Sequence, residues 1–384
     1  MGGQTASPGT THFDMRKLNK VLAFSIAAKT IHVQSGIRWV DIQRFINPYN
    51  LSVKIMQSYA NFTVGGSLSV NAHGRYIGLG PIILSVRRIV IVLADGTKIS
   101  ATETENQDIF YAAIGGYGGI GVIVEAELDL VDNVKVERQS EKISISDYPE
   151  YFTQKIGTSK GVVFHNADIY PPTYKRVNSV TWSETTRDFK GKYTLQPVKR
   201  VYPIHRYFYW LFTETFMGKQ IREYLLDPVL YSKKIVHWRN FEAGYDVSEL
   251  EPANRIFTTF VLQEYFIPVK NFEKFVPLMA EIFQRHKVNI VNVSVRHALP
   301  DSNSLLSWCR EEVFAFVVYY KQRLRENAKN RVAVWTREMI DAAISVNGSY
   351  YLPYQIHATE VSMVGLYPAG ALPQTPFRPQ MIII

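Results

Sequence analysis

Two kinds of hydrophobic pattern divide this chain into two regions. In the first region, short apolar runs alternate with glycine-rich connections, and the Asp-Gly pair at 95–96 marks a tight turn between two alternating runs. Asn106 and Gly115 bracket a helical run as its amino-terminal cap and its end. The pattern predicts strands over 29–33 and 51–55 around the helix WVDIQRFIN, a hairpin over 80–100, a helix over 105–114 and a strand over 121–130.

The second region has a regular succession of strand and helix patterns. Period-two alternation predicts strands over 256–266, 289–297, 311–320 and 349–355, and helical periodicity predicts helices over 269–286 and 331–346. This β-α-β-β-α-β order implies a mostly antiparallel sheet with covering helices on one face. We therefore expect an α+β protein with a first domain over 1–135, a second over 136–368 and an atypical tail over 369–384.

The bulk composition is that of a globular protein with two domains of ordinary size. The 384 residues are 46% hydrophobic and 20% charged, and no apolar run approaches the roughly 18 residues that a membrane-spanning helix needs. The amino end has no secretory signal pattern, so we expect a cytoplasmic protein. Cys309 is the only cysteine, which excludes an internal disulfide and a thiolate metal cluster, and we expect no metal site.

Positive charge is concentrated in the middle of the chain. Residues 187–239 hold eleven Lys or Arg against four Asp or Glu, and they include the aromatic run YPIHRYFYWLF over 202–212. Two interpretations stay open: a basic, partly buried helical insert, or peripheral contact with an anionic membrane. We expect no nucleic-acid partner, because no RNA- or DNA-reading motif accompanies the charge.

Two glycine-rich segments carry the candidate chemistry. Residues 63–75, TVGGSLSVNAHGR, combine small residues, which let a backbone pass close to a flat ligand, with one titratable imidazole, His73. Residues 115–130, GGYGGIGVIVEAELDL, form the second segment. Together the two segments point to a bound flavin.

The second segment contains a motif that is misleading on its own. Residues 116–121 match GxGxxG, but a dinucleotide fingerprint needs a strand before the glycines and a helix starting within them. Here a predicted helix comes before the glycines and a predicted strand after them, so a Rossmann assignment is excluded. A tight helix-to-strand connection is the alternative reading of these glycines.

Taken in order, these segments resemble FAD-linked oxidases of the vanillyl-alcohol oxidase / p-cresol methylhydroxylase (PCMH) superfamily, nearest to the sugar-alcohol, aldonolactone and decaprenylphosphoryl-ribose oxidase branch. The matching pieces are GGQTASP, GIRWVDIQRFINPYNLSVKIMQS, TVGGSLSVNAHGR, GPIILSVRRIVIVLADG, ENQDIFYAAIGGYGGIGVI and GSYYLPYQIHAT. The resemblance implies a PCMH-type FAD-binding domain followed by a substrate domain that covers the reactive face of the flavin.

The resemblance also implies roles for individual residues. His73 is the expected catalytic group, bonding or deprotonating the substrate hydroxyl, although a structural histidine bridging loops is the alternative. Gln263 and Tyr354 are further catalytic candidates. Arg296 is expected either to hold an anionic substrate group or to form a structural ion pair. The expected cofactor-binding residues are Gly2, Gly3, Gln4, Thr63, Gly65, Gly66, Ser69, Asn71, Gly74, Gly121, Val122 and Ile123, and the expected substrate-binding residues are Asn292, Arg296, Tyr351 and Gln355.

Three departures from the family pattern change the expectations. Relatives carry a further unit before the GGQTASP loop, often with the histidine that bonds covalently to the flavin, and we therefore expect non-covalent FAD in a chain truncated at both ends. The tail AGALPQTPFRPQMIII resembles no family segment. Several relatives have a lysine near the position of Tyr354, so another donor would have to stabilise a developing alkoxide here.

These observations predict an FAD-dependent oxidoreductase that oxidises a CH–OH group of a sugar-like, polyol or lactone substrate by hydride transfer to the flavin. The electron acceptor, oxygen or another molecule, stays open. Two alternatives also stay open: a truncated, catalytically silent flavoprotein relative or interaction module, and a peripheral membrane oxidase of a lipid-linked sugar.

Overall fold

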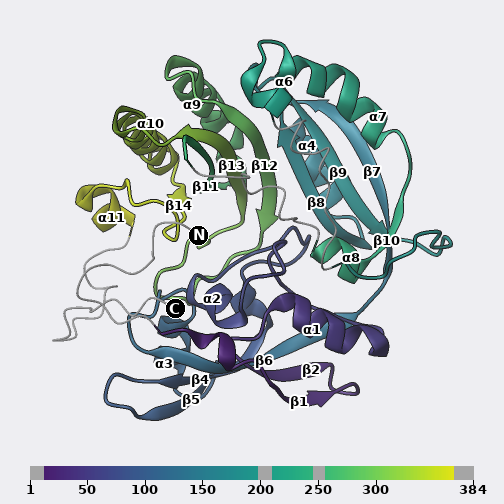
Figure 1. Cartoon of the computed structure of the whole chain (residues 1–384), viewed down its shortest axis with the longest axis vertical. Helices are drawn as coiled ribbons and strands as arrows, with labels where there is room; N and C mark the ends of the chain where they lie inside the picture. The colour runs from purple at the N-terminus through teal and green to yellow at the C-terminus, as the bar shows by residue number, and fades with distance from the viewer. Residues whose placement is uncertain (1–12, 198–209, 245–255, 367–384) are drawn as a thin grey trace.

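The computed structural model describes residues 13–197, 210–244 and 256–366, and it has the predicted α+β architecture. The chain forms two units, each built on one antiparallel sheet (Figure 1). We call residues 13–132 the first unit and residues 135–366 the second unit, since the chain passes from one sheet to the other between Asp132 and Lys135. The expected cofactor residues Gly2, Gly3 and Gln4, and the tail over 369–384, lie outside the described residues.

The sheet of the first unit has six strands. Its order is β1 (Val21–Ser25), β2 (Thr30–Gln34), β6 (Val122–Asp132), β4 (Val86–Val92) and β5 (Lys98–Thr102), while β3 (Leu51–Val53) also pairs with β6. Helices α1 (Trp39–Ile46), α2 (Val64–Ser69) and α3 (Gln107–Ala113) complete the unit. The predicted strands, the β4–β5 hairpin and the helix α3 are confirmed. Residues 82–85 form a 3₁₀ turn before the hairpin.

The start of α3 differs in detail from the prediction. Asn106 lies at the predicted cap position, but it adopts a left-handed conformation with φ of 50°. Its side-chain amide donates to the Ser100 carbonyl oxygen, and its side-chain oxygen accepts no N–H from the helix. Gly115, with φ of 79°, follows the helix as predicted. The glycines over 116–121 then lead into β6, so the helix-first order that excludes a dinucleotide fingerprint is confirmed.

The sheet of the second unit has eight antiparallel strands. Its order is β10 (Val236–Trp238), β7 (Lys135–Ser144), β9 (Arg176–Glu184), β8 (Val162–Ile169), β12 (Ile290–Ala298), β13 (Val313–Arg323), β11 (Thr258–Pro268) and β14 (Ser349–Tyr350). The four strands of the predicted β-α-β-β-α-β region are present, whereas β7 to β10 were not predicted. The predicted strand over 349–355 is too long: after Tyr351 donates its N–H to the Glu264 carbonyl oxygen, Pro353 has no N–H to continue the ladder.

Helices cover one face of the second sheet. They are α4 (Tyr148–Tyr151), continued by a π-helical turn over 152–157, α9 (Phe272–Arg285) and α10 (Glu326–Ser345), which begins five residues before its predicted start. A 3₁₀ turn over 269–271 precedes α9, and α11 (Glu360–Leu366) packs beside α10. The core under these helices is largely aromatic, with Phe275, Phe314 and Phe316 all fully buried.

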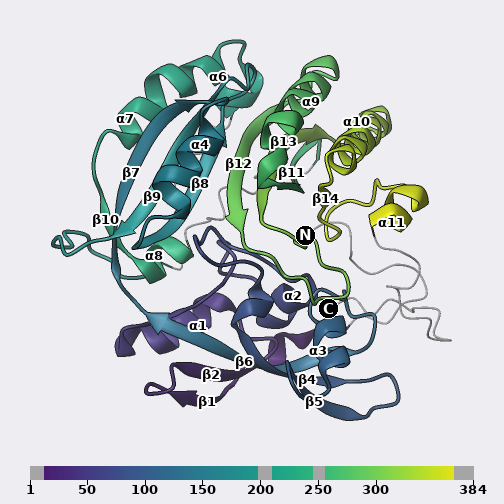
Figure 2. The ribbon, with the colours of Figure 1, turned by 180° about the vertical axis from the view of Figure 1, so that it is seen from behind.

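A separate helical segment packs on the opposite face of the second sheet, near its β7 edge (Figure 2). It consists of α6 (Gly218–Ile221), a π-helical turn over 222–226 and α7 (Asp227–Tyr231). Ser140 on β7 donates to the Tyr231 carbonyl oxygen, and Lys142 donates to the Glu223 carbonyl oxygen. Helix α8 (Arg239–Ala243) lies nearer the first unit. No helix in the described part of the chain has the length and apolar character to cross a bilayer.

The loop that follows α2 joins the two units. His165 on β8 donates its N–H to the Arg75 carbonyl oxygen, and the Arg75 guanidinium forms an ion pair with Glu242 at 2.9 Å. Leu299, after β12, donates its N–H to the Leu79 carbonyl oxygen. Residues 72–80 therefore lie between the two sheets, which places His73 at their junction.

Candidate active site

The loop carrying His73 is fixed by contacts from the second unit. Asn71 adopts a left-handed conformation with φ of 48° and is 1% exposed. Its side-chain amide donates to Asp301 Oδ2 at 2.9 Å and accepts from the Ile83 N–H, while Trp308 Nε1 donates to its carbonyl oxygen at 3.0 Å. These contacts hold His73 in one position, two residues further on.

The His73 imidazole is buried and engaged at both ring nitrogens. Nε2 lies 2.7 Å from Glu264 Oε2, and Nδ1 lies 3.2 Å from the Gly74 carbonyl oxygen. A carbonyl oxygen can only accept, so Nδ1 carries a proton and donates it. His73 Nε2 and Glu264 Oε2 then share one further proton, which can reside on either atom.

Glu264 also receives a second hydrogen bond, from Tyr354. The Tyr354 hydroxyl donates to Glu264 Oε1. Burial raises the pKa of Glu264, but the charge and hydrogen bond of His73, followed by Arg296 and Tyr354, outweigh burial and lower that pKa below its ordinary value. Burial, reinforced by the Glu264 charge, raises the pKa of Tyr354 well above its ordinary value. The two shifts together favour an ionised Glu264 that accepts a hydrogen bond from a neutral Tyr354.

A positive charge and an aromatic wall complete the cluster. Arg296 acts electrostatically on both Glu264 and Tyr354, and its Nε is buried with no hydrogen-bond partner in the described structure. The rings of Phe266, Trp308 and Tyr351 lie 5.7, 5.1 and 6.2 Å from the His73 ring, centroid to centroid. These rings exclude water and strengthen the electrostatic interactions they surround.

The glycines of the two cofactor segments are held against protein backbone and side chains. A Cβ on Gly65 would lie 2.9 Å from Ser35 Cβ, one on Gly74 2.5 Å from the Met56 carbonyl oxygen, and one on Gly121 2.5 Å from the Val92 carbonyl oxygen. Close approach of neighbouring segments therefore requires glycine at these positions. Thr63 caps α2 through its hydroxyl, which accepts the Gly66 N–H at 3.2 Å.

Unpartnered polar groups lie where the two segments meet, and they fit a bound flavin nucleotide. Tyr117 donates its N–H to the Ser69 carbonyl oxygen, which packs the second glycine segment on the end of α2. Among the described residues, the Ser69 hydroxyl is buried there without a partner, as is that of Ser35 beside Gly65. On β6, Val122 and Ile123 pair with β4, whereas the described backbone contacts on the β2 side end at Val124, whose carbonyl oxygen accepts the Ser35 N–H. Hydroxyls and strand-edge amides of this kind match the polar groups of FAD.

Three predicted site residues lie away from the His73 cluster. Gln263 is on the helix-covered face, where its amide donates to Thr336 Oγ1 at 3.0 Å and accepts from the Tyr265 hydroxyl at 2.7 Å. Asn292 lies four strand residues from Arg296, about 13 Å, and bonds Asp168 and Arg222 beneath the α6–α7 segment. Gln355 contacts His357 at 3.2 Å. The structure therefore groups His73, Tyr354, Tyr351 and Arg296, and separates Gln263, Asn292 and Gln355 from them.

Two members of the cluster were not predicted. The alternation of the strand predicted that Glu264 and Gln263 lie on opposite faces, and they do. The sequence does not show which of the two faces meets the first unit. The available signal was an acidic residue inside an apolar strand, VLQEYF. Trp308 comes from an irregular connection and had no sequence signal.

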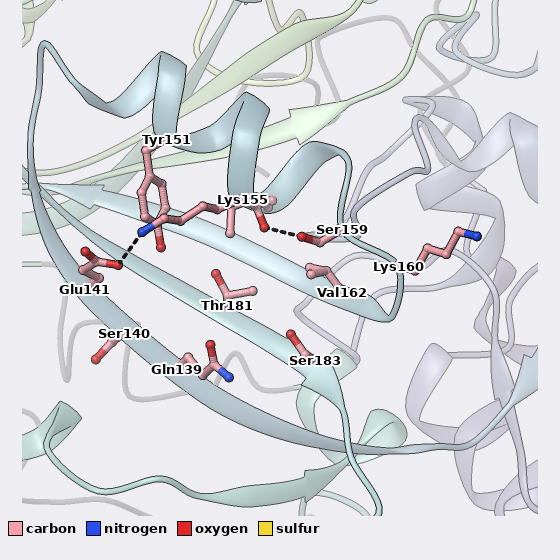
Figure 3. Close-up of a pocket in the computed structure, with 11 residues that line it drawn as sticks. Gln139, Ser140, Glu141, Tyr151, Lys155, Ser159, Lys160, Val162, Thr181 and Ser183 are labelled. Carbon is pink, nitrogen blue, oxygen red and sulfur yellow. Dashed lines mark hydrogen bonds and ion pairs between the residues drawn. The ribbon is translucent and has the colours of Figure 1, made fainter.

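A separate hollow lies on the outer, α4-covered side of the second sheet (Figure 3). Its volume is about 570 Å³, and polar side chains of β7, β9 and residues 151–160 line it. Glu141 and Lys155 face each other across it at 3.9 Å. Both side chains are more than half exposed, so the hollow lacks the desolvated groups of the His73 cluster.

Comparisons with known proteins indicate which class of protein this chain resembles. Residues 1–102 match the family model of an FAD binding domain. The chain is 29% identical over 181 residues to an FAD-dependent monooxygenase of Aspergillus niger, covering 44% of this chain and 29% of the relative. It is 30% identical over 103 residues to alditol oxidase of Streptomyces sp., a match that covers 27% of this chain and 24% of the relative. It is 27% identical over 196 residues to mitochondrial L-galactono-1,4-lactone dehydrogenase of Brassica oleracea, a match that covers 49% of this chain and 32% of the relative. The matches thus span a quarter to a third of the relatives' length, and the chain is a distant homologue of these flavoproteins.

Proposed function

We propose that this protein is an FAD-dependent oxidoreductase that oxidises a CH–OH group of a sugar-like, polyol or lactone substrate. The FAD binding domain supports the cofactor, and two relatives are named for an alditol and for a galactonolactone. The observation that carries the proposal is the buried His73–Glu264–Tyr354 cluster, which both units contribute at their junction. Perturbed titratable groups gathered in one desolvated place are typical of catalytic sites.

In this proposal, Ser69, Val122 and Ile123 contact FAD from the first unit, together with the other cofactor residues expected from the sequence. Bound FAD supplies the hydride acceptor. Non-covalent attachment is favoured because His73 is already engaged at both nitrogens, and Cys309 is buried with its thiol donating to the Leu299 carbonyl oxygen. Acid or heat denaturation should release the flavin from the protein, and retention of yellow colour on the unfolded chain would contradict this part.

We assign to Tyr354 the role of receiving the substrate proton, because its side chain is only partly buried while its hydroxyl already donates to Glu264. As the substrate hydroxyl gives its proton to the Tyr354 oxygen, Tyr354 passes its own proton to Glu264 Oε1. His73 acts on Glu264 as a positioning residue, since neither of its nitrogens is available to substrate in this arrangement. Arg296 supplies the positive charge that relatives obtain from lysine.

Reduction of the flavin by alcohols tests this proposal. The full chain, reconstituted with FAD, is mixed anaerobically with alditols and aldonolactones while the visible flavin band is followed. Tyr354→Phe should retain flavin and slow reduction about 10²-fold or more. Tyr350→Phe is the matched control, because the Tyr350 hydroxyl is buried without a partner in the described residues and lies outside the cluster. A flavin that binds but that no alcohol bleaches would support the catalytically silent alternative.

A further inference from the structure

The α6–α7 segment presents its apolar side to solvent. Helical residues that face away from the sheet include Leu225 and Val229, 63% and 72% exposed, and Phe216 before the segment is 97% exposed. Met217, Tyr224 and Leu230 are also more than half exposed. Leu225 and Val229 lie four residues apart on this outward side of the segment. We call residues 216–230 on this side the apolar stripe.

The charged side of the same segment is buried. Glu223 is 2% exposed and pairs with Arg176 at 2.9 Å, and Asp227 is 6% exposed and receives the Tyr170 hydroxyl at 2.9 Å. Arg222 pairs with Asp227 at 3.4 Å. These contacts fix the rotation of the segment about its axis, so the apolar stripe cannot turn toward the protein without leaving buried charges unpaired.

Further exposed apolar residues lie at the same end of the second sheet. Asn289, just before β12, donates to the Thr213 carbonyl oxygen, and Leu324, just after β13, donates to the Phe257 carbonyl oxygen. Trp210 and Phe257 are 58% and 73% exposed. The stripe and these residues therefore lie at the end of the second sheet that is away from the first unit. Exposed apolar side chains gathered at one end of a protein are typical of interaction surfaces.

The charge around the stripe is positive. Lys233 and Lys234 are exposed directly after α7, whereas Glu223 and Asp227, acidic residues of the same segment, are buried in ion pairs. A symmetric dimer through this face would bring like charges together. An anionic lipid surface would pair with the lysines and accept the apolar side chains at the depth of its headgroups.

We propose that the apolar stripe, with Lys233 and Lys234, docks this protein on the surface of an anionic membrane. The proposal is independent of the reaction proposed above, because none of these residues belongs to the His73 cluster. Of the two interpretations of the basic region over 187–239, the proposal favours contact with an anionic membrane over a basic, partly buried helical insert.

Vesicle co-sedimentation of the full chain tests the proposal. The protein should sediment with phosphatidylcholine–phosphatidylglycerol vesicles at low salt, bind at least about 10-fold more weakly to phosphatidylcholine alone, and lose most binding at roughly 0.5 M salt. Leu225→Glu/Val229→Glu should weaken binding to anionic vesicles about 10-fold or more. Ile26→Glu, a substitution at a half-exposed apolar residue of the first unit, is the matched control and should bind as the parent does.

Two further measurements keep the test decisive. Lys233→Gln/Lys234→Gln should weaken binding about 10-fold or more at low salt while leaving the far-ultraviolet spectrum and melting temperature unchanged. Absence of binding to anionic vesicles at low salt, or equal binding by Leu225→Glu/Val229→Glu, would overturn the proposal. A dimer of the parent that this double variant abolishes would also overturn it, by assigning the surface to a second copy of the chain.

Discussion

Replacing Glu264 by glutamine separates proton acceptance from packing in the His73 cluster. Glutamine has nearly the same volume, and its amide oxygen can still accept the Tyr354 hydroxyl. Its amide N–H can donate to Nε2 of a neutral His73, which keeps its Nδ1 proton on the Gly74 carbonyl oxygen. Both neighbours therefore stay hydrogen-bonded, but the cluster no longer contains a carboxylate that can hold a proton.

The expected magnitudes follow from these contacts. Hydrogen bonds to charged groups contribute about 1.5–3 kcal/mol each, against about 0.5–1.5 kcal/mol for neutral ones. Changing two bonds from charged to neutral should lower the free energy of unfolding by about 1–3 kcal/mol. Loss of the proton acceptor should slow alcohol-driven flavin reduction about 10²–10⁴-fold.

The pH dependence has a defined sign. The pKa of Glu264 is lowered in the folded protein, mainly because the charge of His73 outweighs the effect of burial. Its stabilising contribution is complete above the ordinary carboxyl pKa of about 4.3 and is lost as the pH falls through the lowered folded value. Glu264→Gln should lack this part of the acid sensitivity, so the parent and the variant should converge in stability at low pH.

Anaerobic stopped-flow reduction and denaturant unfolding, each across pH, measure both effects. Glu312→Gln is the matched control, because Glu312 also faces a histidine, His297, at 2.6 Å but lies outside the cluster. It should leave the reduction rate and its pH profile unchanged. If Glu264→Gln retains flavin and is reduced by alcohol at the parent rate with an unshifted pH profile, the carboxylate takes no proton in the reaction and the reasoning above is wrong.

Three further predictions concern binding and stability. Ser69→Ala should weaken FAD binding about 3- to 10-fold, as loss of one hydrogen bond implies, without lowering the stability of the apoprotein, because its hydroxyl has no partner in the described structure; titration with FAD and apoprotein melting measure the two effects. Trp308→Ala should lower the free energy of unfolding by about 3–5 kcal/mol, since it removes a buried ring stacked on Phe266 at 4.0 Å; a melting temperature equal to that of the parent would contradict this packing role. Burial lowers the pKa of His165 to about 3, so the parent should lose up to about 1.4 kcal/mol per pH unit as the pH falls below about 6.5. His165→Gln should reduce this slope in denaturant titrations between pH 7 and 5, and an identical slope would show that His165 is protonated in the folded state.

The fold was predictable where one face of an element is apolar and the other polar. Helix α9 has a clear apolar stripe, and the β4–β5 hairpin has a β-branched run followed by an Asp-Gly turn, so both patterns were visible in the sequence. Strands β8 and β9 were missed because they are buried on both faces while containing polar residues. His165 on β8, for example, is fully buried between the Tyr148 hydroxyl and the Thr181 hydroxyl. Such residues break the alternation by which a strand is recognised.

The site was predictable only in part because its chemistry depends on pairings between distant segments. His73 stood out beside glycine in a chain with few histidines, but its partner lies 191 residues further along the chain. The alternation of β11 placed Gln263 and Glu264 on opposite faces correctly. Only the packing of the second sheet shows that helices cover Gln263 and that Glu264 meets the first unit.

The need to hold the two units together does not by itself explain why the His73–Glu264 pair lies at their junction. Burying two charges costs desolvation energy, and well-packed apolar residues of similar volume commonly give equal or greater stability. The adjacent contacts already join the units: Tyr351 donates to the Val70 carbonyl oxygen at 2.8 Å, and Trp308 donates to that of Asn71. A buried pair of this kind, enclosed by aromatic rings and influenced by the charge of Arg296, does not hold the units together better than those contacts do. The His73–Glu264 pair instead provides a proton acceptor that is held in position in an environment with little water. Proton transfer at a hydride-transfer centre requires such an acceptor.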